Sequence, residues 1–185
     1  MSEYLTNQFL VAMPALASGV FAQTVTYVCE HNDQGALGIV INRPLKMLLA
    51  HVFEQYHLPI DKSRWGAQPV LRGGPVQQEQ GFVIHRAGQT WDKTVLVSDQ
   101  VHLTTSRDIL DAMANDQGPP EALVALGYAG WEAGQLENEL SQNSWLTVPA
   151  DERVLFDVPY EQRWLAAGKL LGINLTMMSQ HAGHA

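Results

Sequence analysis

The residues best suited to hold an anion are arginines that stand beside glycines or beside a predicted helix start. Arg72-Gly73-Gly74 and Thr105-Ser106-Arg107 are two such segments, and Arg43 directly follows a predicted strand. A guanidinium next to backbone N–H groups, or at the positive end of a helix, can bind a carboxylate or a phosphate. The same residues also suit a tight turn and a helix cap, so ligand binding and a structural role are both open at this stage.

A second set of polar residues could support covalent chemistry. Cys29, Glu30, His31, Asn42 and His85 lie near the ends of predicted strands, where active-site groups tend to collect. A thiol with a histidine base is a nucleophile, which would suit a hydrolase or a transferase. The competing interpretation is structural, because Cys29 falls on an apolar strand face, where cysteine acts as a small buried hydrophobe. His31 is expected in the turn beyond that strand.

Arg43 could also take part in a purely structural polar cluster. It follows one predicted strand end, and Glu30 and Asp33 lie across the predicted hairpin. We expect these groups to meet at one rim of the sheet, where an ion pair is ordinary surface structure.

The histidines do not have the spacing of a metal site. His181 and His184 stand three residues apart, but neither an HExxH pattern nor paired cysteines accompany them or the scattered histidines elsewhere. We therefore predict no bound metal and no cofactor.

The glycines within residues 127–134 follow a predicted strand and could present backbone N–H groups to a phosphate. Their spacing matches neither GxGxxG nor GxxxxGK followed by Ser or Thr. We predict a structural turn with glycines at positive φ and with Trp131 packed against the body of the protein.

The elements that position these residues are expected to form one domain, spanning residues 1–185. A chain of 185 residues has the size of a single domain, and 46% hydrophobic with 16% charged residues excludes intrinsic disorder and a coiled coil. The formal net charge of −8 has the wrong sign for binding nucleic-acid phosphates, so direct nucleic-acid binding is disfavoured.

The cysteine content and the first segment of the chain bear on cellular location. One cysteine cannot close an intramolecular disulfide, which suits a reducing compartment. Residues 9–22 are apolar, but no Lys or Arg precedes them and Pro14 interrupts them, which argues against a signal peptide. No run of apolar residues is long enough for a membrane-spanning helix. These features predict a cytoplasmic protein without membrane association.

Hydrophobic spacing predicts runs of strands with short helices between some of them. We expect strands at residues 9–13, 24–29, 36–42, 70–72, 81–86, 94–98, 101–103, 121–129 and 145–148, and helices at 45–56, 105–115, 134–140 and 159–171. Pro44 is expected near the first turn of its helix, and Thr105 with Asp108 is expected to form an acidic capping box. Without a regular strand–helix–strand rhythm, the pattern indicates an α+β fold with a mixed or antiparallel sheet.

Two of these elements have faces that we expect to be buried. Strand alternation places Val25, Tyr27 and Cys29 on one face, and the last helix is expected to supply apolar contacts from Trp164, Leu165, Leu170 and Leu171.

Short blocks distributed over nearly the whole chain resemble the bacterial YqgE/AlgH family. Gly38-Ile39-Val40-Ile41-Asn42-Arg43-Pro44-Leu45 and Leu126-Gly127-Tyr128-Ala129-Gly130-Trp131 are two of them; the others are residues 9–14, 29–32, 73–76, 81–85, 104–110, 134–137 and 183–185. The resemblance implies an α+β domain in which a bifurcated sheet curls into a pseudo-barrel with flanking helices. It implies no catalytic residues, although some relatives carry the name of a transcriptional regulator of exopolysaccharide synthesis.

Together these observations favour a non-catalytic binding or regulatory protein that acts through a protein partner or a small anionic ligand. The family-like blocks consist mainly of Gly, Pro and apolar residues and contain no spaced set of acid, base and nucleophile. An enzyme that uses Cys29, His31, Arg43 or His85 is the first alternative. A DNA-binding regulator is the second, although no helix-turn-helix pattern is recognisable.

Overall fold

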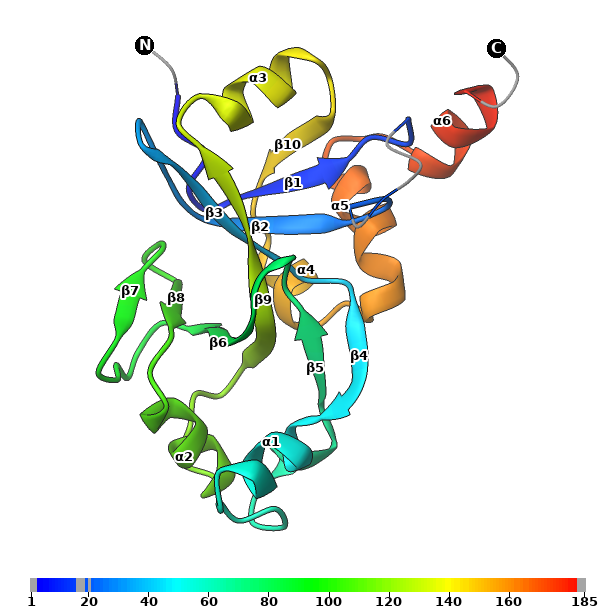
Figure 1. Cartoon of the computed structure of the whole chain (residues 1–185). Coiled ribbons are helices and arrows are strands. Elements are labelled where there is room, and N and C mark those ends of the chain that lie inside the picture. Colours follow the sequence, from blue (N-terminus) through cyan, green and yellow to red (C-terminus); the bar gives the residue numbers. More distant parts are fainter. Residues whose placement is uncertain (1–2, 16–18, 20, 183–185) are drawn as a thin grey trace.

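The computed structural model describes residues 3–15, 19 and 21–182, which form a curled sheet with helices on its outer faces (Figure 1). The strands are β1 (Gln8–Ala12), β2 (Val25–Asn32), β3 (Gly35–Val40), β4 (Pro44–Leu48), β5 (Pro69–Arg72), β6 (Val76–Arg86), β7 (Thr94–Leu96), β8 (Val101–Thr104), β9 (Ala122–Glu132) and β10 (Trp145–Pro149). The helices are α1 (Leu49–Gln55), α2 (Asp108–Ala114), α3 (Gln135–Ser141), α4 (Glu152–Phe156), α5 (Arg163–Leu170) and α6 (Leu175–Ala182), with 3-10 turns η1 (Arg64–Ala67) and η2 (Tyr160–Gln162).

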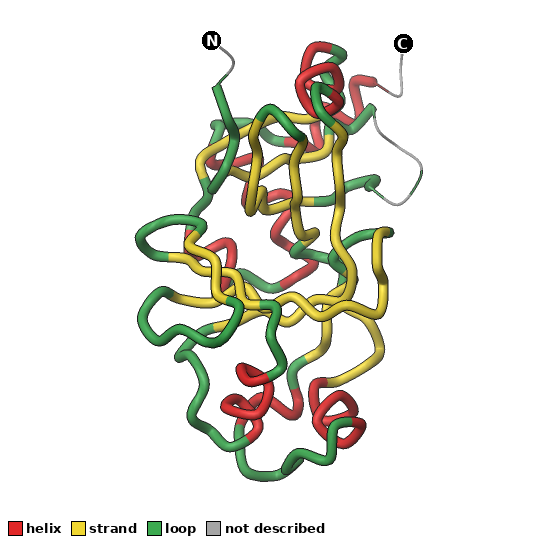
Figure 2. The backbone as a smooth tube through the Cα atoms, turned by 60° about the vertical axis from the view of Figure 1, so that its left-hand side comes forward, coloured by secondary structure: helices red, strands yellow, loops and turns green. Residues whose placement is uncertain are grey.

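Strand β9 joins the two halves of the sheet. The strands follow the order β10-β1-β2-β3-β9-β6-β8-β7, and β5 branches from β9 to pair with β4. The end of β9 at Ala129–Glu132 pairs with β3, whereas its first part pairs with β6 and, in parallel, with β5. The sheet therefore divides along one strand and curls into a half-barrel (Figure 2), which confirms the predicted α+β fold with a mixed, bifurcated sheet and flanking helices.

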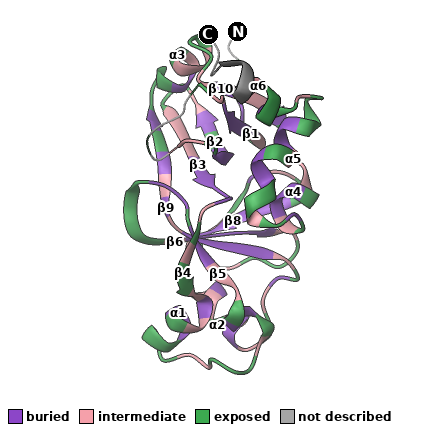
Figure 3. Ribbon diagram, turned by 90° about the vertical axis from the view of Figure 1, so that its right-hand side faces the viewer, coloured by how far each residue is buried: buried purple, intermediate pink, exposed green. Residues whose placement is uncertain are grey.

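Three buried clusters hold these layers together, and Figure 3 shows that the buried residues lie on the strands and on parts of the helices. The largest contains Val25, Tyr27 and Cys29, so the face predicted for that strand is confirmed, and α4 and α5 cover it. A second cluster lies under α1 and α2, and a third packs Trp131 and Trp145 beneath α3. Burial of this apolar area is the main force that stabilises the fold.

The helix predicted over residues 45–56 is wrong in its first part. Residues Pro44–Leu48 form β4, where Pro44 pairs with Leu71 and Leu48 pairs with Pro69 of β5. Pro44 is therefore not in the first turn of a helix. The helix begins at Leu49, whose turn-spaced partners Val52 and Phe53 are buried with it. Pairing with a distant strand overrode a local spacing that suited both conformations.

The capping box predicted at Thr105 is also wrong. Helix α2 begins at Asp108, after Arg107, and the Thr105 N–H donates to the Lys93 carbonyl instead. The Ser106 hydroxyl accepts from the Lys93 N–H at 3.0 Å and donates to Asp108 at 2.5 Å. These residues tie the end of β8 to the segment before β7 rather than closing a helix.

The glycine-rich turn predicted at residues 127–134 is largely strand. β9 continues to Glu132, and a left-handed Gly127 (φ +79°) bends it where it passes from one half of the sheet to the other. The prediction that Trp131 is packed is confirmed. The segment is extended because it pairs with β3, where Ala36 lies opposite Trp131 and Leu37 lies opposite Gly130.

The C-terminal third contains elements that the spacing did not predict. The spacing did not predict helices α4 and α6. The helix predicted over residues 159–171 divides into η2 and α5, and the chain then turns at a left-handed Gly172 (φ +73°). Trp164 is buried as predicted, whereas Leu165, Leu170 and Leu171 are exposed, contrary to the prediction. A short helix has one buried stripe, and here Trp164, Ala167 and Gly168 occupy it.

Candidate anion site

Two of the predicted arginines meet at one cavity where the halves of the sheet separate. The cavity has a volume of about 200 Å³, and Arg43, Arg72 and Gly74 line it, as do Gly19, Phe21, Val40 and Pro75. The backbone explains the meeting, because the Arg72 N–H donates to the Arg43 carbonyl at 2.7 Å. Pairing of β4 with β5 therefore places two guanidinium groups beside the same space.

The glycines at this cavity are required by close backbone packing. A Cβ atom on Gly73 would lie 2.3 Å from the Gly127 carbonyl oxygen, and one on Gly74 would lie 2.1 Å from the Tyr128 carbonyl carbon. The connection between β5 and β6 thus rests directly on the backbone of β9. The Gly73 carbonyl also accepts a hydrogen bond from the Val40 N–H at 2.8 Å, which ties this connection to β3.

The charge of the two arginines is not neutralised by carboxylates within the described part of the chain. Arg43 donates to the Ala22 carbonyl, and Arg72 donates to the Gln78 side chain at 3.4 Å. Both acceptors are neutral, and the ion pairs found among the described residues involve other side chains. Two arginines that line a cavity where no described lining residue is acidic create a site that favours an anion.

The other predicted anion segment is not organised in the same way. Thr105 and Ser106 line a separate cavity of about 120 Å³, whose other walls are mainly apolar and include Glu79. Arg107 does not line it; its guanidinium lies 4.4 Å from the centre of the Tyr56 ring and donates to the Tyr56 carbonyl at 2.9 Å. Because a carboxylate lines this cavity and no described arginine does, the cavity does not favour an anion.

The structure does not bring together the residues predicted to support covalent chemistry. His31 pairs with Ala36 and through it with Trp131 on β9, whereas His85 pairs with Ala122 at the other end of β9. These two positions lie nine residues apart in sequence, which is about 30 Å along the strand at the usual rise. Since Cys29 lies in the core between sheet and helices, no described residue of this set offers it a base.

His31, Asn42 and His85 instead hold the structure in place. His31 is buried in β2, not in a turn; its Nδ1 accepts from the Leu5 N–H, and its Nε2–H donates to Glu137 of α3. Desolvation alone raises the pKa of Glu137, but the interaction with His31 and a backbone hydrogen bond together leave that pKa below its usual value. The Asn42 side chain accepts from Val25 and donates to Gln23.

His85 belongs to a buried hydrogen-bonded network that the sequence did not predict. Its Nδ1–H donates to the Arg86 carbonyl at 2.9 Å, so its Nε2 accepts from the Thr104 hydroxyl at 2.7 Å. The Thr104 hydroxyl lies 2.8 Å from that of Thr94. Burial lowers the pKa of His85, which keeps the ring neutral.

The polar cluster predicted around Arg43 does not form. Glu30 and Asp33 lie at the β2–β3 turn, whereas Arg43 follows the opposite end of β3. The six residues of β3 separate them by about 20 Å. In an antiparallel hairpin the two strand ends that lie together are those joined by the turn, so residues beyond the far end cannot reach it.

Neither a metal centre nor a membrane span is evident in the described segments. No group of three or more His, Cys, Asp or Glu side chains among residues 3–15, 19 and 21–182 could hold a metal ion. His184 of the His181–His184 pair lies outside the described residues. No helix in the described segments is both long enough and apolar enough to cross a membrane.

Cys29 gives a direct test of the structural interpretation. Its side chain is 3% exposed, and burial, with a smaller effect of Glu30, raises the pKa of its thiol far above the usual value. The thiolate is the reactive form, so we expect the native protein to resist a disulfide-exchange reagent and to react fully in guanidinium chloride. Absorbance of the released aromatic thiolate measures both. Rapid labelling of the native protein would contradict the packing described here.

Sequence and structure comparisons agree with this fold. The profile of the AlgH-like family matches residues 9–176. A UPF0301 protein of Saccharophagus degradans is 51% identical over 98% of this chain and 89% of its own length, and one from an Azoarcus species is 52% identical over 100% and 98%.

Two solved structures extend the comparison to three dimensions. The solution structure of the AlgH protein from Pseudomonas aeruginosa has a TM-score of 0.81 and 49% identity, and it covers 100% of this chain and 99% of that one. A crystal structure from Corynebacterium diphtheriae, 20% identical with a TM-score of 0.75, covers 96% and 93% and shares the fold. The family profile and these relatives show that the chain belongs to the AlgH-like family.

Proposed function

We propose that this protein binds a small anion at the cavity between Arg43 and Arg72 and acts as a binding or regulatory protein. The observation that supports this proposal is that Arg43, from the connection between β3 and β4, and Arg72, from β5, line one cavity at which no described lining residue is acidic. None of the described residues that line the cavity is His, Cys, Asp or Glu. A site with cations but without a general base or nucleophile is suited to binding rather than to turnover.

The electrostatics of the whole chain make this location distinctive. The protein carries a net charge of −8, so most of its surface repels anions. Arg72 is exposed and held by one long hydrogen bond, which leaves its guanidinium able to turn toward a ligand. Arg43 is half-buried and anchored to Ala22, so it supplies a fixed donor. One fixed and one adjustable cation suit a ligand that enters from solvent.

Replacing Arg72 tests the proposal with little risk to the fold. Titration of the protein with inorganic pyrophosphate, followed by calorimetry and by amide chemical shifts, is expected to show binding with shifts at Gly73 and Gly74. Because a hydrogen bond to a charged group contributes about 1.5–3 kcal/mol, we expect Arg72→Gln to weaken binding by about 10- to 100-fold.

The matched control is Arg153→Gln, which removes the same charge from an exposed position on α4 outside this cavity. It is expected to bind pyrophosphate like the unaltered protein. Absence of binding by the unaltered protein, or an equal loss in both variants, would refute the proposed site.

A further inference from the structure

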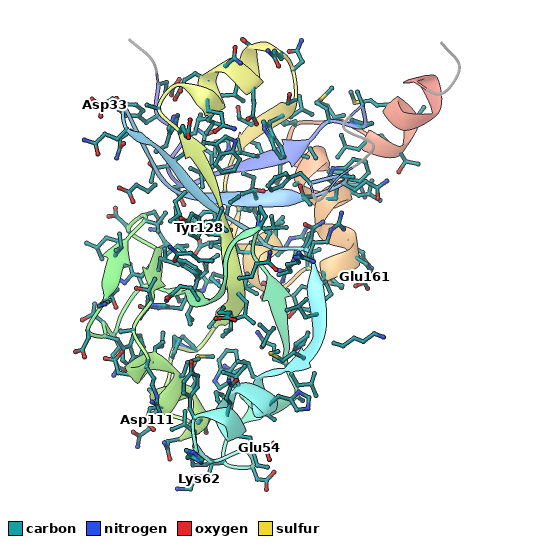
Figure 4. The ribbon with its side chains drawn as sticks, in the orientation of Figure 1. Asp33, Glu54, Lys62, Asp111, Tyr128 and Glu161 are labelled. Atoms are coloured by element: carbon teal, nitrogen blue, oxygen red, sulfur yellow. The ribbon has the colours of Figure 1, made fainter. Side chains whose placement is uncertain are left out.

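Arg43 lines a second cavity as well as the first. This second cavity has a volume of about 410 Å³ and lies between the start of β4 and the helices η2, α5 and α6. Its lining residues are Gln23, Asn42, Arg43, Pro44, Tyr160, Glu161, Trp164, Leu165 and Thr176. Figure 4 shows Glu161 at this side of the molecule, beyond the upper end of β4. The sequence did not indicate this cavity, because its walls come from three distant segments.

The backbone shows how the two cavities adjoin. Phe21 lines the first and Gln23 lines the second, and the Ala22 carbonyl between them accepts a hydrogen bond from Arg43. A guanidinium carries five N–H donors in one plane, and this hydrogen bond uses one of them. Arg43 therefore stands at the boundary with donor groups that can serve a ligand occupying both sides.

The chemistry of the second cavity differs from that of the first. Tyr160 contributes aromatic surface, as does the small exposed part of Trp164, and the Arg163 guanidinium lies 4.5 Å from the centre of the Tyr160 ring. Glu161 contributes a carboxylate, which repels an anion and accepts hydrogen bonds. A flat ring with an N–H donor fits these walls, whereas a second anionic group does not.

We infer that the ligand is an anion carried on a flat aromatic ring that bears an N–H donor. The anionic group, a phosphate or a carboxylate, binds Arg43 and Arg72, the ring packs against Tyr160, and the donor bonds to Glu161. The second cavity alone, with about 410 Å³, falls within the roughly 300–1,000 Å³ of small-molecule sites. This inference rests on the proposed function, since it assigns the anion to the same arginines.

A graded series of probes separates the contributions of anion, ring and donor. Inorganic phosphate supplies the anion alone, phenyl phosphate adds a ring, 4-aminophenyl phosphate adds the donor, and adenosine 5′-monophosphate places an amine-bearing ring farther from the phosphate. The compound 4-aminobenzoate replaces phosphate by carboxylate. Calorimetric affinities are expected to rise along the phosphate series, by about tenfold or more for a stacked ring. Tight binding of 4-aminobenzoate instead would support the same site and identify the anion as a carboxylate.

Two variants test whether residues of the second cavity cause the higher affinity of the ring-bearing probes. Tyr160→Ala is expected to remove most of the advantage of the ring-bearing probes and to leave the affinity for phosphate unchanged. Glu161→Gln, at an exposed position, is expected to remove the advantage of 4-aminophenyl phosphate over phenyl phosphate and provides a test if Tyr160→Ala fails to fold.

The outcomes distinguish this inference from the proposal on which it rests. If no ring-bearing probe binds more tightly than inorganic phosphate, or if neither variant changes the ratio, the ring site is wrong although the anion site stands. If Arg72→Gln leaves every affinity unchanged, the anion site itself is wrong and the ring site falls with it.

Discussion

Gly74→Ala is expected to lower the free energy of unfolding by about 3 kcal/mol or more, because the new methyl group would overlap main-chain atoms. Its Cβ would lie 2.1 Å from the Tyr128 carbonyl carbon and 2.2 Å from the carbonyl oxygen. Side chains can rotate away from a clash, but this part of β9 is held by its pairing with β6 and β3 on either side of Tyr128. Relief therefore requires the β5–β6 connection to move away from β9.

The control for this substitution is Gly81→Ala in β6. A Cβ at Gly81 would meet no atom within 4 Å, and its φ is not in the left-handed region. Alanine is the better residue in a strand interior by roughly 0.5–1 kcal/mol, so this variant is expected to match or slightly exceed the unaltered protein. Urea denaturation followed by tryptophan fluorescence measures both. Equal midpoints for the two variants would show that the β5–β6 connection is not tightly packed on β9.

Arg163→Met is the second substitution for which a large loss is expected, about 3 kcal/mol, through broken hydrogen bonds in the core. Arg163 is only 2% exposed, yet it donates to the Val158 carbonyl at 2.9 Å and to the Ile41 carbonyl at 2.6 Å. Burial lowers its pKa to about 10, which still leaves it charged at neutral pH. Methionine keeps much of the side-chain volume but leaves both carbonyls without these donors.

Two comparisons make the Arg163 result specific. Arg153→Met at an exposed position on α4 is expected to change stability little, since exposed substitutions usually fall within about 0.5 kcal/mol. Arg163→Lys keeps a charge but cannot direct two donors along fixed, separate directions, so only part of the stability is expected to return. If Arg163→Met unfolded at the same urea concentration as Arg153→Met, the hydrogen bond from Arg163 to the Ile41 carbonyl would not stabilise the packing of α5 on the sheet.

The sequence predicted elements well where one local pattern dominated. Alternation in residues 24–29 identified the strand and the face shared by Val25, Tyr27 and Cys29, although the opposite face is buried as well, and α3 confirms the helix predicted over residues 134–140. It failed where a distant strand decided between two conformations that the residues allow. Leu45 and Leu48 have helical spacing relative to Val52, but β5 pairs with their segment and makes it extended.

For the candidate site, the sequence likewise indicated which residue types could bind an anion but not how they are arranged in three dimensions. Arg72 and Gly74 could be selected because a cation beside glycines suits an anion, and Arg43 because it follows a predicted strand. That Arg43 and Arg72 share one cavity depends on the pairing of β4 with β5, which no local pattern encodes. Arg163 gave no signal at all, since an arginine in a short amphipathic helix is usually exposed.

The sharing of β9 between both halves of the sheet has a consequence for how the chain folds during synthesis. Neither half can close until residues 122–132 have left the ribosome, and the edge of β1 that does not face β2 stays unpaired longer still, because β10 ends at residue 149. Most of the nascent chain therefore carries unpaired strand edges until late in translation. Contacts of such large sequence separation slow folding, so the protein is expected to fold slowly and all at once after elongation, with early exposure to chaperones.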